Sequence, residues 1–357
     1  MSGASAAALD ALVTRTGEWI RGTGPESDIV ISSRIRLARN LRDFSFLTQA
    51  SPETRVQVEE KVRREILTPG LGVDVAYLPM AELDPLDRLF LVERHLISRE
   101  HATHDGVRGL AFSPEETLSI MVNEEDHLRI QVLRSGFELG SAMAEIDRVD
   151  DALERRLTWA FDTQFGYLTA CPTNAGTAMR VSVMLHLPAL VMTKQLEKVF
   201  ASLNRISFTV RGLYGEGTQA TGDFYQISNQ ATLGKTEAEI LAEMQEVVPA
   251  IARFEREWRA KLQSEHRSRL EDKIYRAWGI LTNARVIGSE ETMELLSFVR
   301  LGMHLDLLPV RPKQVNEIFI FTQPAHLQKV SGKALESQQR DEARADFVRD
   351  RLLHEKK

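Results

Sequence analysis

The sequences LSIMVN at residues 118–123 and HLRIQVL at residues 127–133 decide the fold class. In both runs apolar residues recur at about every second position, which is the period of a half-buried β-strand. Three acidic residues, Glu124, Glu125 and Asp126, separate the runs. So short a polar connection predicts an antiparallel hairpin with an acidic tip.

Further strand-like runs flank this hairpin, and they do not alternate regularly with helices. DIVISSRIR, from residue 28, precedes it, and four runs follow it: YLTACPT, MRVSVMLHLP, RISFTVRG and FYQISNQ. Parallel strands need a long crossover, usually a helix, between each pair. We therefore expect an α+β fold with a mostly antiparallel sheet flanked by helices.

The rear of the chain has a helical pattern throughout. A capping box from Thr236 to Glu239 begins it, and we expect the first helix there to be interrupted at Pro249. The patterns predict a short N-terminal segment over residues 1–27, a mixed domain over residues 28–255 and an all-helical domain over residues 256–357.

Composition excludes several classes of protein. The 357 residues carry a formal charge of −6 and are 43% hydrophobic, which is typical of a globular protein. No apolar run reaches about 18 residues and no signal-peptide pattern begins the chain, so we expect a soluble cytoplasmic protein without a membrane span. The single cysteine, Cys171, excludes an internal disulfide and a cysteine-rich zinc site. The net acidity argues against general nucleic-acid binding.

Arginine outnumbers lysine about three to one among the 45 basic residues. On a strand, Arg34 and Arg36 would lie two positions apart and point to one face. Arg129, Arg180 and Arg211 occupy three other strand-like runs. Taken singly, each is expected at the surface of its strand. Gathered on one face, they would bind a triphosphate, whose charge must be neutralised during phosphoryl transfer.

Three further side chains bring chemistry of their own. Glu125 lies at the hairpin tip, and Glu216 lies in the glycine-rich segment RGLYGEGTQATGD, which fits neither a P-loop nor a dinucleotide-binding turn. Glu216 is either solvated on a surface loop or laid on a substrate when that loop closes. Cys171 is either a small buried apolar residue or a thiol whose pKa nearby hydroxyls and amides lower. The acidic residues of the hairpin are adjacent rather than at ligand spacing, so no protein metal site is expected.

Four motifs, in this order, resemble those of the phosphagen, or guanidino, kinases: SSRIRLARN, VNEEDHLRI, CPTNAGT followed by two residues and an arginine, and RGLYGEGTQATGDFYQISNQ. The resemblance covers about residues 28–255. It implies the guanidino-kinase catalytic fold and transfer of the γ-phosphoryl group of ATP to a guanidinium nitrogen. Mg²⁺ is expected to enter with ATP and to keep mostly water and phosphate ligands.

The resemblance also implies roles for individual residues. Glu125 and Glu216 match the two carboxylates that hold the guanidinium group, and Cys171 matches a reactive thiol near the substrate nitrogen. His95 matches a histidine that packs near the adenine. The residues that match nucleotide-contacting positions are Ser32, Ser33, Arg34, Ile35, Arg36, His95, Arg129, Arg180, Val181, Ser182, Val183, Met184, Arg211, Gly212, Leu213, Tyr214, Gly215 and Glu216.

Two features favour a protein substrate over a small guanidine. About 27 residues precede the first motif, where small-guanidine kinases of the family carry a helical domain, so the site is expected to be open. The segment Arg340, Asp341, Glu342, Ala343, Arg344 and Ala345 matches the RDxxRA motif of family members that phosphorylate proteins. That match implies an allosteric phosphoarginine pocket, in which Arg340 and Arg344 would share one helix face. The alternative is a solvated charged helix.

The resemblance thus implies an ATP:protein-L-arginine N-phosphotransferase that marks proteins for Clp-type degradation and regulates a stress response. It implies three kinds of protein partner: arginine-bearing substrates that include a CtsR-type repressor, a McsA-type zinc-containing activator, and a Clp-type unfoldase or protease. A homodimer or higher homo-oligomer is expected to form through the helical rear domain. Two alternatives stay open: a kinase for free arginine or another small guanidine, and a non-catalytic adaptor that binds phosphoarginine.

Overall fold

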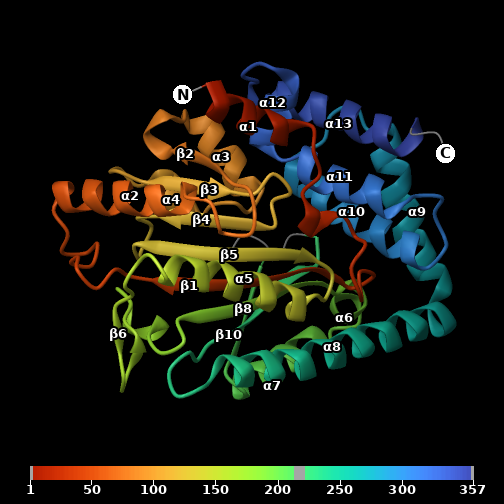
Figure 1. Cartoon of the computed structure of the whole chain (residues 1–357). Helices are drawn as coiled ribbons and strands as arrows, with labels where there is room; N and C mark the ends of the chain where they lie inside the picture. The colour runs from red at the N-terminus through yellow and green to blue at the C-terminus, as the bar shows by residue number, and fades with distance from the viewer. Residues whose placement is uncertain (1–2, 213–221, 355–357) are drawn as a thin grey trace.

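The computed structural model describes residues 3–212 and 222–354, which form a central sheet with helices on both sides (Figure 1). The sheet has eight strands in the order β2-β3-β4-β5-β1-β8-β10-β9, and every neighbouring pair is antiparallel. The predicted hairpin is the pair β4 and β5, with Leu118 opposite Val132. The predicted fold class, a mostly antiparallel sheet flanked by helices and followed by a helical region, is confirmed.

The strands are β1 (Val30–Arg39), β2 (Ala76–Pro79), β3 (Gly109–Phe112), β4 (Leu118–Val122), β5 (Leu128–Ser135), β8 (Met179–His186), β9 (Phe208–Gly212) and β10 (Phe224–Asn229), with a separate ribbon of β6 (Phe161–Asp162) and β7 (Gly166–Tyr167).

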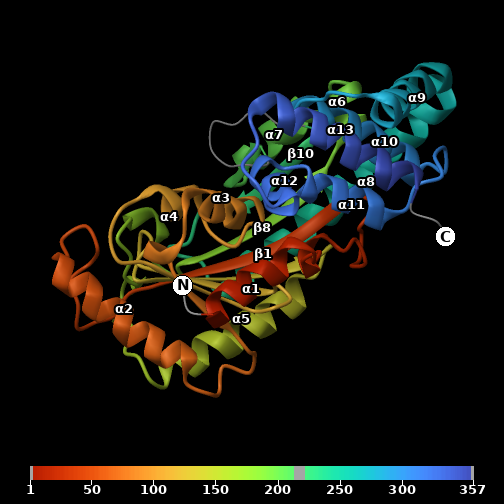
Figure 2. The same cartoon turned by 90° about the horizontal axis from the view of Figure 1, so that it is seen from above.

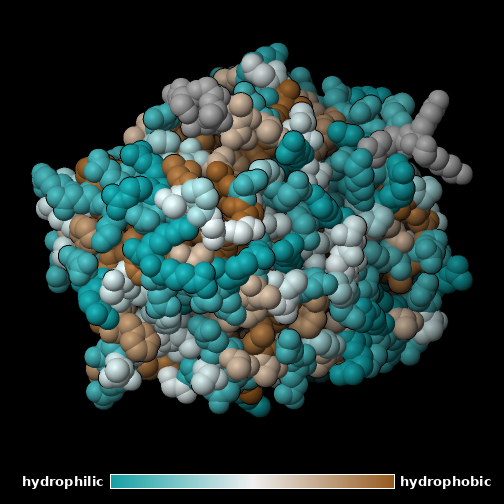
Figure 3. Space-filling view, viewed as in Figure 1, coloured by the Kyte–Doolittle hydropathy of each residue, from teal (hydrophilic) through white to brown (hydrophobic). Residues whose placement is uncertain are grey.

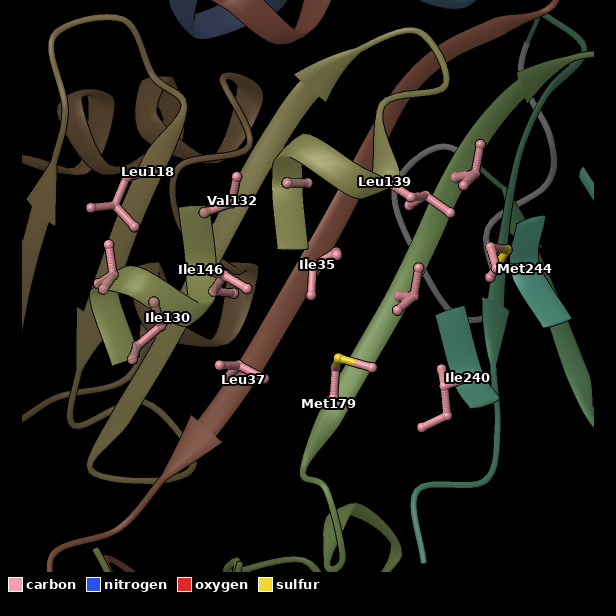
Figure 4. Packing of buried hydrophobic residues seen from close by; sticks show 14 of the residues in the cluster. Ile35, Leu37, Leu118, Ile130, Val132, Leu139, Ile146, Met179, Ile240 and Met244 are labelled. Atoms are coloured by element: carbon pink, nitrogen blue, oxygen red, sulfur yellow. The ribbon is translucent and has the colours of Figure 1, made fainter. Parts of the chain in front are cut away.

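One face of the sheet is apolar and covered by helices α5 (Leu139–Glu154) and α8 (Glu237–Glu265). Figure 4 shows side chains of β1, β4, β5 and β8 meeting residues of these two helices in one buried cluster. Ile35 of β1 lies in this cluster, with Val132 and Val181 opposite it on the two neighbouring strands. Because successive strand residues point to opposite faces, this arrangement turns Arg34 and Arg36 to the other, polar face.

The polar face is itself covered at two places, which leaves its middle accessible. Over β2 to β4 it packs against α1 (Gly3–Val13) and α3 (Pro85–Glu93), through residues such as Leu110 and Met121. At the far ends of the central strands, Leu133 and Met184 pack against Trp19 and against the helices of the rear region. Figure 2 shows α5 and α3 on opposite sides of the strands.

The remaining helices of the front region are short or lie at its edge. Helix α2 begins after Ser51, whose side chain accepts a hydrogen bond from the backbone N–H of Thr54. The elements are α2 (Pro52–Leu67), α4 (Arg99–Thr103), α6 (Pro188–Met192) and α7 (Leu196–Arg205), with 3-10 helices η1 (Glu18–Ile20), η2 (Met80–Glu82) and η3 (Pro172–Asn174).

The rear region is helical, and its first helix does not break where the sequence predicted. Helix α8 runs through Pro249 without interruption. Proline removes one backbone hydrogen bond, but Val248, Ile251 and Ala252 beside it are buried in the sheet's apolar cluster, and that burial holds the helix together. The domain boundary predicted at residue 255 lies inside α8 and stays a prediction. The other rear helices are α9 (Arg267–Asn283), α10 (Ser289–His304), α11 (Pro312–Phe321), α12 (Pro324–Ser331) and α13 (Ser337–Leu353).

The surface seen in Figure 3 is largely hydrophilic, with scattered hydrophobic residues. Within residues 3–212 and 222–354, no helix combines the length and the apolar character that crossing a membrane requires.

Candidate active site

A cleft of about 1520 Å³ opens on the polar face of the sheet. Its lining includes all five arginines that were predicted to bind phosphate: Arg34 and Arg36 from β1, Arg129 from β5, Arg180 from β8 and Arg211 from β9. The strand register places Arg36 directly opposite Arg180. The fold therefore gathers on one surface five cations that are spread over almost 180 positions of the sequence.

The guanidinium groups of these arginines lie close enough for their positive charges to repel one another. Arg34 donates from Nε to Ser182 Oγ at 3.2 Å and from Nη2 to Gln226 Oε1 at 2.9 Å. Burial, followed by the charges of Arg129, Arg180 and Arg211, lowers the pKa of Arg34 from 12.5 to about 9. Arg34 still carries its charge at neutral pH, so a bound polyanion would relieve the repulsion that the cations impose on one another.

A buried carboxylate holds one of these arginines in place. Glu124 accepts hydrogen bonds from Arg129 Nη1 at 2.6 Å, from Ser98 Oγ at 2.6 Å and from the backbone N–H of Glu125 at 2.9 Å. Burial, followed by the charge of Arg180, lowers the pKa of Arg129 to about 10. Glu124 thus lines the cleft with a carboxylate that is already engaged by three donors, and it orients Arg129.

The other residues of the acidic tip are engaged in holding the tip in shape. Asn123 has a φ of +58° and donates its side chain to two backbone carbonyls, at 2.8 and 2.9 Å. Asp126 accepts from Asn40 Nδ2 at 2.6 Å and from the backbone N–H of Ala170 at 2.7 Å. His127 Nδ1 lies 3.0 Å from the backbone nitrogen of Leu41, which donates to it.

Glu125 is the exposed residue of the tip, and it lies in the cleft. Asn174 Nδ2 donates to its Oε2 at 3.4 Å. Partial burial, followed by the charges of Asp126, Glu124 and Glu100, raises the pKa of Glu125 above its ordinary value. The tip therefore presents to the cleft one carboxylate with an enhanced affinity for protons.

The segment that carries Cys171 also lines the cleft. Cys171 lines the cleft, precedes η3, and has its Sγ 3.0 Å from Thr173 Oγ1. Gly176 has a φ of +104°, and a Cβ there would lie only 2.4 Å from the carbonyl oxygen of Thr232. Only glycine fits this turn, which presses the Cys171 segment against the chain that follows β10. Cys171 and Glu125 both line the cleft, and their catalytic roles stay predictions.

His95 lines the cleft near Arg34. It lines both the cleft and a small adjoining cavity, together with Trp19, Ser32 and Met184. Its ring meets the Trp19 ring edge to face, with centroids 4.8 Å apart. Burial, followed by the charge of Arg34, lowers the pKa of His95 to about 3, so its imidazole is neutral at physiological pH.

Sequence reasoning missed several residues at this site. Trp19 sits in a polar N-terminal stretch that carries no spacing signal. Gln226 lies in the strand-like run FYQISNQ and faces Arg211 in the register, so a period-two reading of that run would have found it. Ser98 caps the short helix α4 and Asn174 ends the 3-10 helix η3, and segments this short carry no periodic signal.

Four predicted nucleotide-contacting residues with described side chains bring them neither to the cleft nor to the adjoining cavity. The side chains of Ile35, Val181 and Val183 lie in the apolar cluster on the other face of the sheet. Ser33 Oγ donates to the backbone carbonyl of Gly136 at 2.8 Å. The cause is the alternation of a strand, which sends every second residue of a matched segment away from the site.

Part of the predicted site lies outside the described residues. Gly212 ends β9, and Leu213, Tyr214, Gly215 and Glu216 follow it in the range 213–221. The second carboxylate at Glu216 therefore stays a prediction.

The charged motif on α13 has two unlike arginines. Arg344 is 1% exposed and donates to the carbonyl oxygens of Thr322 and Ile287, each at 2.9 Å, and to Asp341. Arg340 is half-buried and donates to the carbonyl oxygen of Leu335 at 2.7 Å. Of the other residues of the motif, Glu342 is exposed, Ala343 is half-buried and Ala345 is buried. The phosphoarginine pocket stays a prediction.

No three His, Cys, Asp or Glu side chains are grouped to hold a metal ion in the part of the chain that the structure describes. Arginine, hydroxyl and amide groups dominate the phosphate-binding end, so a cation there would need ligands brought by the substrate.

Known proteins match both regions of the chain. Residues 57–258 match the C-terminal catalytic domain of ATP:guanido phosphotransferases, and residues 267–357 match the C-terminal domain of protein-arginine kinase McsB. The protein-arginine kinase of Symbiobacterium thermophilum is 49% identical over 346 residues, which cover 96% of this chain and 98% of that protein. That of Bacillus subtilis is 45% identical over 338 residues, which cover 94% of this chain and 93% of that protein.

Solved structures share the fold at lower identity. Lombricine kinase aligns with a TM-score of 0.57 and 25% identity over 71% of each chain. The duplicated taurocyamine kinase of Schistosoma mansoni, with bound transition state analog components, aligns with a TM-score of 0.56 and 26% identity over 69% of this chain and 37% of that chain. The chain therefore belongs to the ATP:guanido phosphotransferase family, in its protein-arginine kinase branch.

Proposed function

We propose that this kinase transfers the γ-phosphoryl group of Mg-ATP to arginine side chains of proteins, within the cleft on the polar face of the sheet, to give N-phosphoarginine. The observation that supports this most is the lining of the cleft. Five arginines line it together with the carboxylate of Glu125 and the thiol of Cys171. The arginines suit a triphosphate, and the carboxylate suits a guanidinium group.

The five arginines of the cleft would bind the triphosphate of ATP and neutralise its negative charge. Arg34, Arg36, Arg129, Arg180 and Arg211 would donate hydrogen bonds to phosphate oxygens through their planar guanidinium groups. Mg²⁺ would enter with the nucleotide and add to the neutralisation of charge that spreads over the transferred group. His95, neutral and backed by Trp19, would pack against the base. Side-chain hydroxyls of Ser32 and Ser182 lie in the adjoining cavity for further polar contacts.

The carboxylate of Glu125 would help to turn a guanidinium group into a nucleophile. Guanidinium is protonated at neutral pH, with a pKa above about 12, and is a poor nucleophile. Glu125, with Glu216 as its partner, would fix the plane of the group and accept the proton that leaves as the N–P bond forms and the bond from phosphorus to ADP breaks. The raised pKa of Glu125 suits a proton acceptor. Cys171 would lie near the reacting nitrogen, and the cleft would hold that nitrogen in line with phosphorus.

The size of the cleft supports a substrate larger than a free amino acid. Pockets for small molecules usually measure about 300–1,000 Å³, and this one reaches from the sheet to Leu47, to the start of α2 at Pro52, and to Asp105 beyond α4. That reach leaves room for a peptide segment beside the modified arginine.

The wider role is proposed from likeness to protein-arginine kinases. We infer that residues 28–255 act as the catalytic domain and that residues 256–357 bind phosphoarginine and a second copy of the chain. The kinase would act in the cytoplasm, where ATP is supplied, and would mark proteins for Clp-type degradation during stress. A CtsR-type repressor would be one substrate, and a McsA-type zinc-containing protein would be an activator.

A transfer assay tests the activity. The chain is incubated with Mg-ATP and either an arginine-rich protein or free arginine, and acid-labile phosphoramidate is measured on each. Label on the protein is expected. Label confined to free arginine would instead identify a small-guanidine kinase, and no transfer to either would leave a phosphoarginine-binding adaptor. The control is Glu257→Gln, a carboxylate on the exposed side of α8 and outside the cleft, which should behave as wild type.

A binding assay tests the proposed allosteric pocket. Arg340→Ala should weaken the binding of phosphoarginine measured by calorimetry, and should reduce any activation that phosphoarginine causes. An unchanged isotherm would refute the assignment of Arg340 to that pocket.

A further inference from the structure

The carboxylate of Glu93 caps a helix that lies 232 residues later in the sequence. Its two oxygens accept the backbone N–H groups of Ala325 and His326, each at 2.8 Å. These are the second and third residues of α12, whose N-cap residue, Gln323, sends its side chain to the carbonyl of Phe319 instead. Glu93 is only 7% exposed, so the cap is a buried, charge-assisted pair of hydrogen bonds between α3 and the rear region.

The same end of α3 holds His95 in a strained conformation. His95 has a φ of +59°, which a residue other than glycine keeps only where its surroundings hold it. Its carbonyl accepts a hydrogen bond from Gln131 Nε2 of β5 at 2.7 Å. The preceding residue, Arg94, is fully buried and pairs with Glu116. Glu93 adds the third restraint, so three successive residues are each fixed to a different part of the molecule.

Arg344 holds the other side of the turn that Glu93 caps. Its Nε donates to the carbonyl of Thr322 at 2.9 Å, just before α12 begins. Burial raises the pKa of Glu93 to about 7, and the two amide hydrogen bonds and the charge of Arg344 oppose that rise. The turn over residues 322–326 therefore lies between a buried cation of α13 and a buried carboxylate of α3.

We propose that Glu93 is a positioning residue for ATP, which holds His95 against the nucleotide by anchoring the end of α3 to α12. A shift of α13 that moves the turn over residues 322–326 would be carried to His95 through Glu93. The kinase thus has a physical link between its rear helices and its nucleotide wall. The proposal rests on the proposed function in one respect, namely the placement of the base against His95.

Steady-state kinetics of the full chain test this link. We would measure KM for ATP and kcat for Glu93→Gln and Glu93→Asp. Gln removes the charge, and Asp keeps it but is one methylene too short to reach both amides. Gln is close to Glu in size and keeps one acceptor oxygen for the two amides, so the Gln variant is expected to fold. Both variants should raise KM for ATP about fivefold or more, the lower end of usual coupling between linked sites, and should keep kcat within about twofold.

A matched control separates positioning from stability. Asp87 also joins α3 to α12, through Lys329 Nζ at 2.5 Å, but lies at the start of α3 and far along the helix from His95. Asp87→Asn should lower the free energy of unfolding, measured with urea, and leave KM for ATP unchanged. If it raised KM as much as Glu93→Gln does, the effect would be a loss of packing and the proposal would be wrong.

His95→Ala distinguishes the two ways in which the idea can fail. A raised KM for His95→Ala with wild-type KM for both Glu93 variants would overturn the role of Glu93 alone. Wild-type KM for all three variants would overturn the base wall at His95 and the Glu93 proposal together.

Discussion

Removing the carboxylate of Asp150 is expected to lower the free energy of unfolding by about 3–5 kcal/mol. Its partner, Arg39, ends β1 and is 1% exposed. Arg39 donates from Nε and Nη2 to Asp150, with Nη2 and Oδ2 2.6 Å apart, and its guanidinium carbon lies 3.5 Å from the centroid of the Tyr167 ring. In Asp150→Ala the guanidinium group of Arg39 retains its contact with the Tyr167 ring and its hydrogen bonds to the carbonyl oxygens of Ala38 and Thr177. An uncompensated charge would then be buried, and that is the source of the loss.

The double variant Arg39→Met with Asp150→Leu is the decisive comparison. It buries no charge, and a well-packed apolar pair often replaces a buried ion pair with little loss. Urea unfolding followed by circular dichroism gives the free energy for each variant. Glu271→Ala, which removes the partner of the exposed Arg267, is the control and should leave the free energy unchanged. Wild-type stability for Asp150→Ala, or an equal loss in the double variant, would refute the reasoning.

Three further predictions concern the active site. Glu125→Gln should lower turnover about 10²–10⁴-fold, the usual size of a proton-transfer contribution, while ATP binding by calorimetry survives; normal turnover would contradict its role as proton acceptor. Glu100→Gln removes a charge that raises the pKa of Glu125, and since activity needs the ionised Glu125, the acidic limb of the pH profile of kcat should move to lower pH; an acidic limb that stays at its wild-type position would contradict its assignment to Glu125. Gly176→Ala should lower the free energy of unfolding by about 1–3 kcal/mol, because φ is +104° and the new Cβ would lie 2.4 Å from the carbonyl oxygen of Thr232. Urea unfolding measures this loss. An unchanged urea midpoint would mean that the turn relaxes to accept the Cβ.

Local sequence patterns predicted the hairpin, and they predicted that Arg34 and Arg36 share a face. Both predictions depend only on the two-residue period of a strand. Leu118 to Leu133 reads as two alternating runs, and they form β4 and β5. Arg34 and Arg36 share a face for the same reason. What residue spacing leaves open is which strands become neighbours. The placement of β1 between β5 and β8, which brings Arg36 opposite Arg180, depends on pairing over more than 140 positions.

The misses share a physical cause, which is tertiary burial. Pro249 should end a helix by local rules, but the apolar residues on either side of it are buried against the sheet and keep α8 continuous. The alternative of a solvated charged helix does not hold for Arg344 of α13, because it is buried and donates to carbonyls of two other segments. Trp19 carries no motif at all and reaches His95 only because η1 folds over the end of β5.

The apolar cluster around Trp19 also has a consequence for synthesis on the ribosome. It contains Ile31 and Leu133 from early strands together with Val348 and Leu352 from α13. Domains fold as they emerge from the N-terminal side, so most of the sheet is available while this cluster is still incomplete. Until α13 has left the exit tunnel, strand residues that belong inside the protein stay open to water and to chaperones. A nascent kinase would therefore complete the cluster around Trp19 only once α13 has emerged.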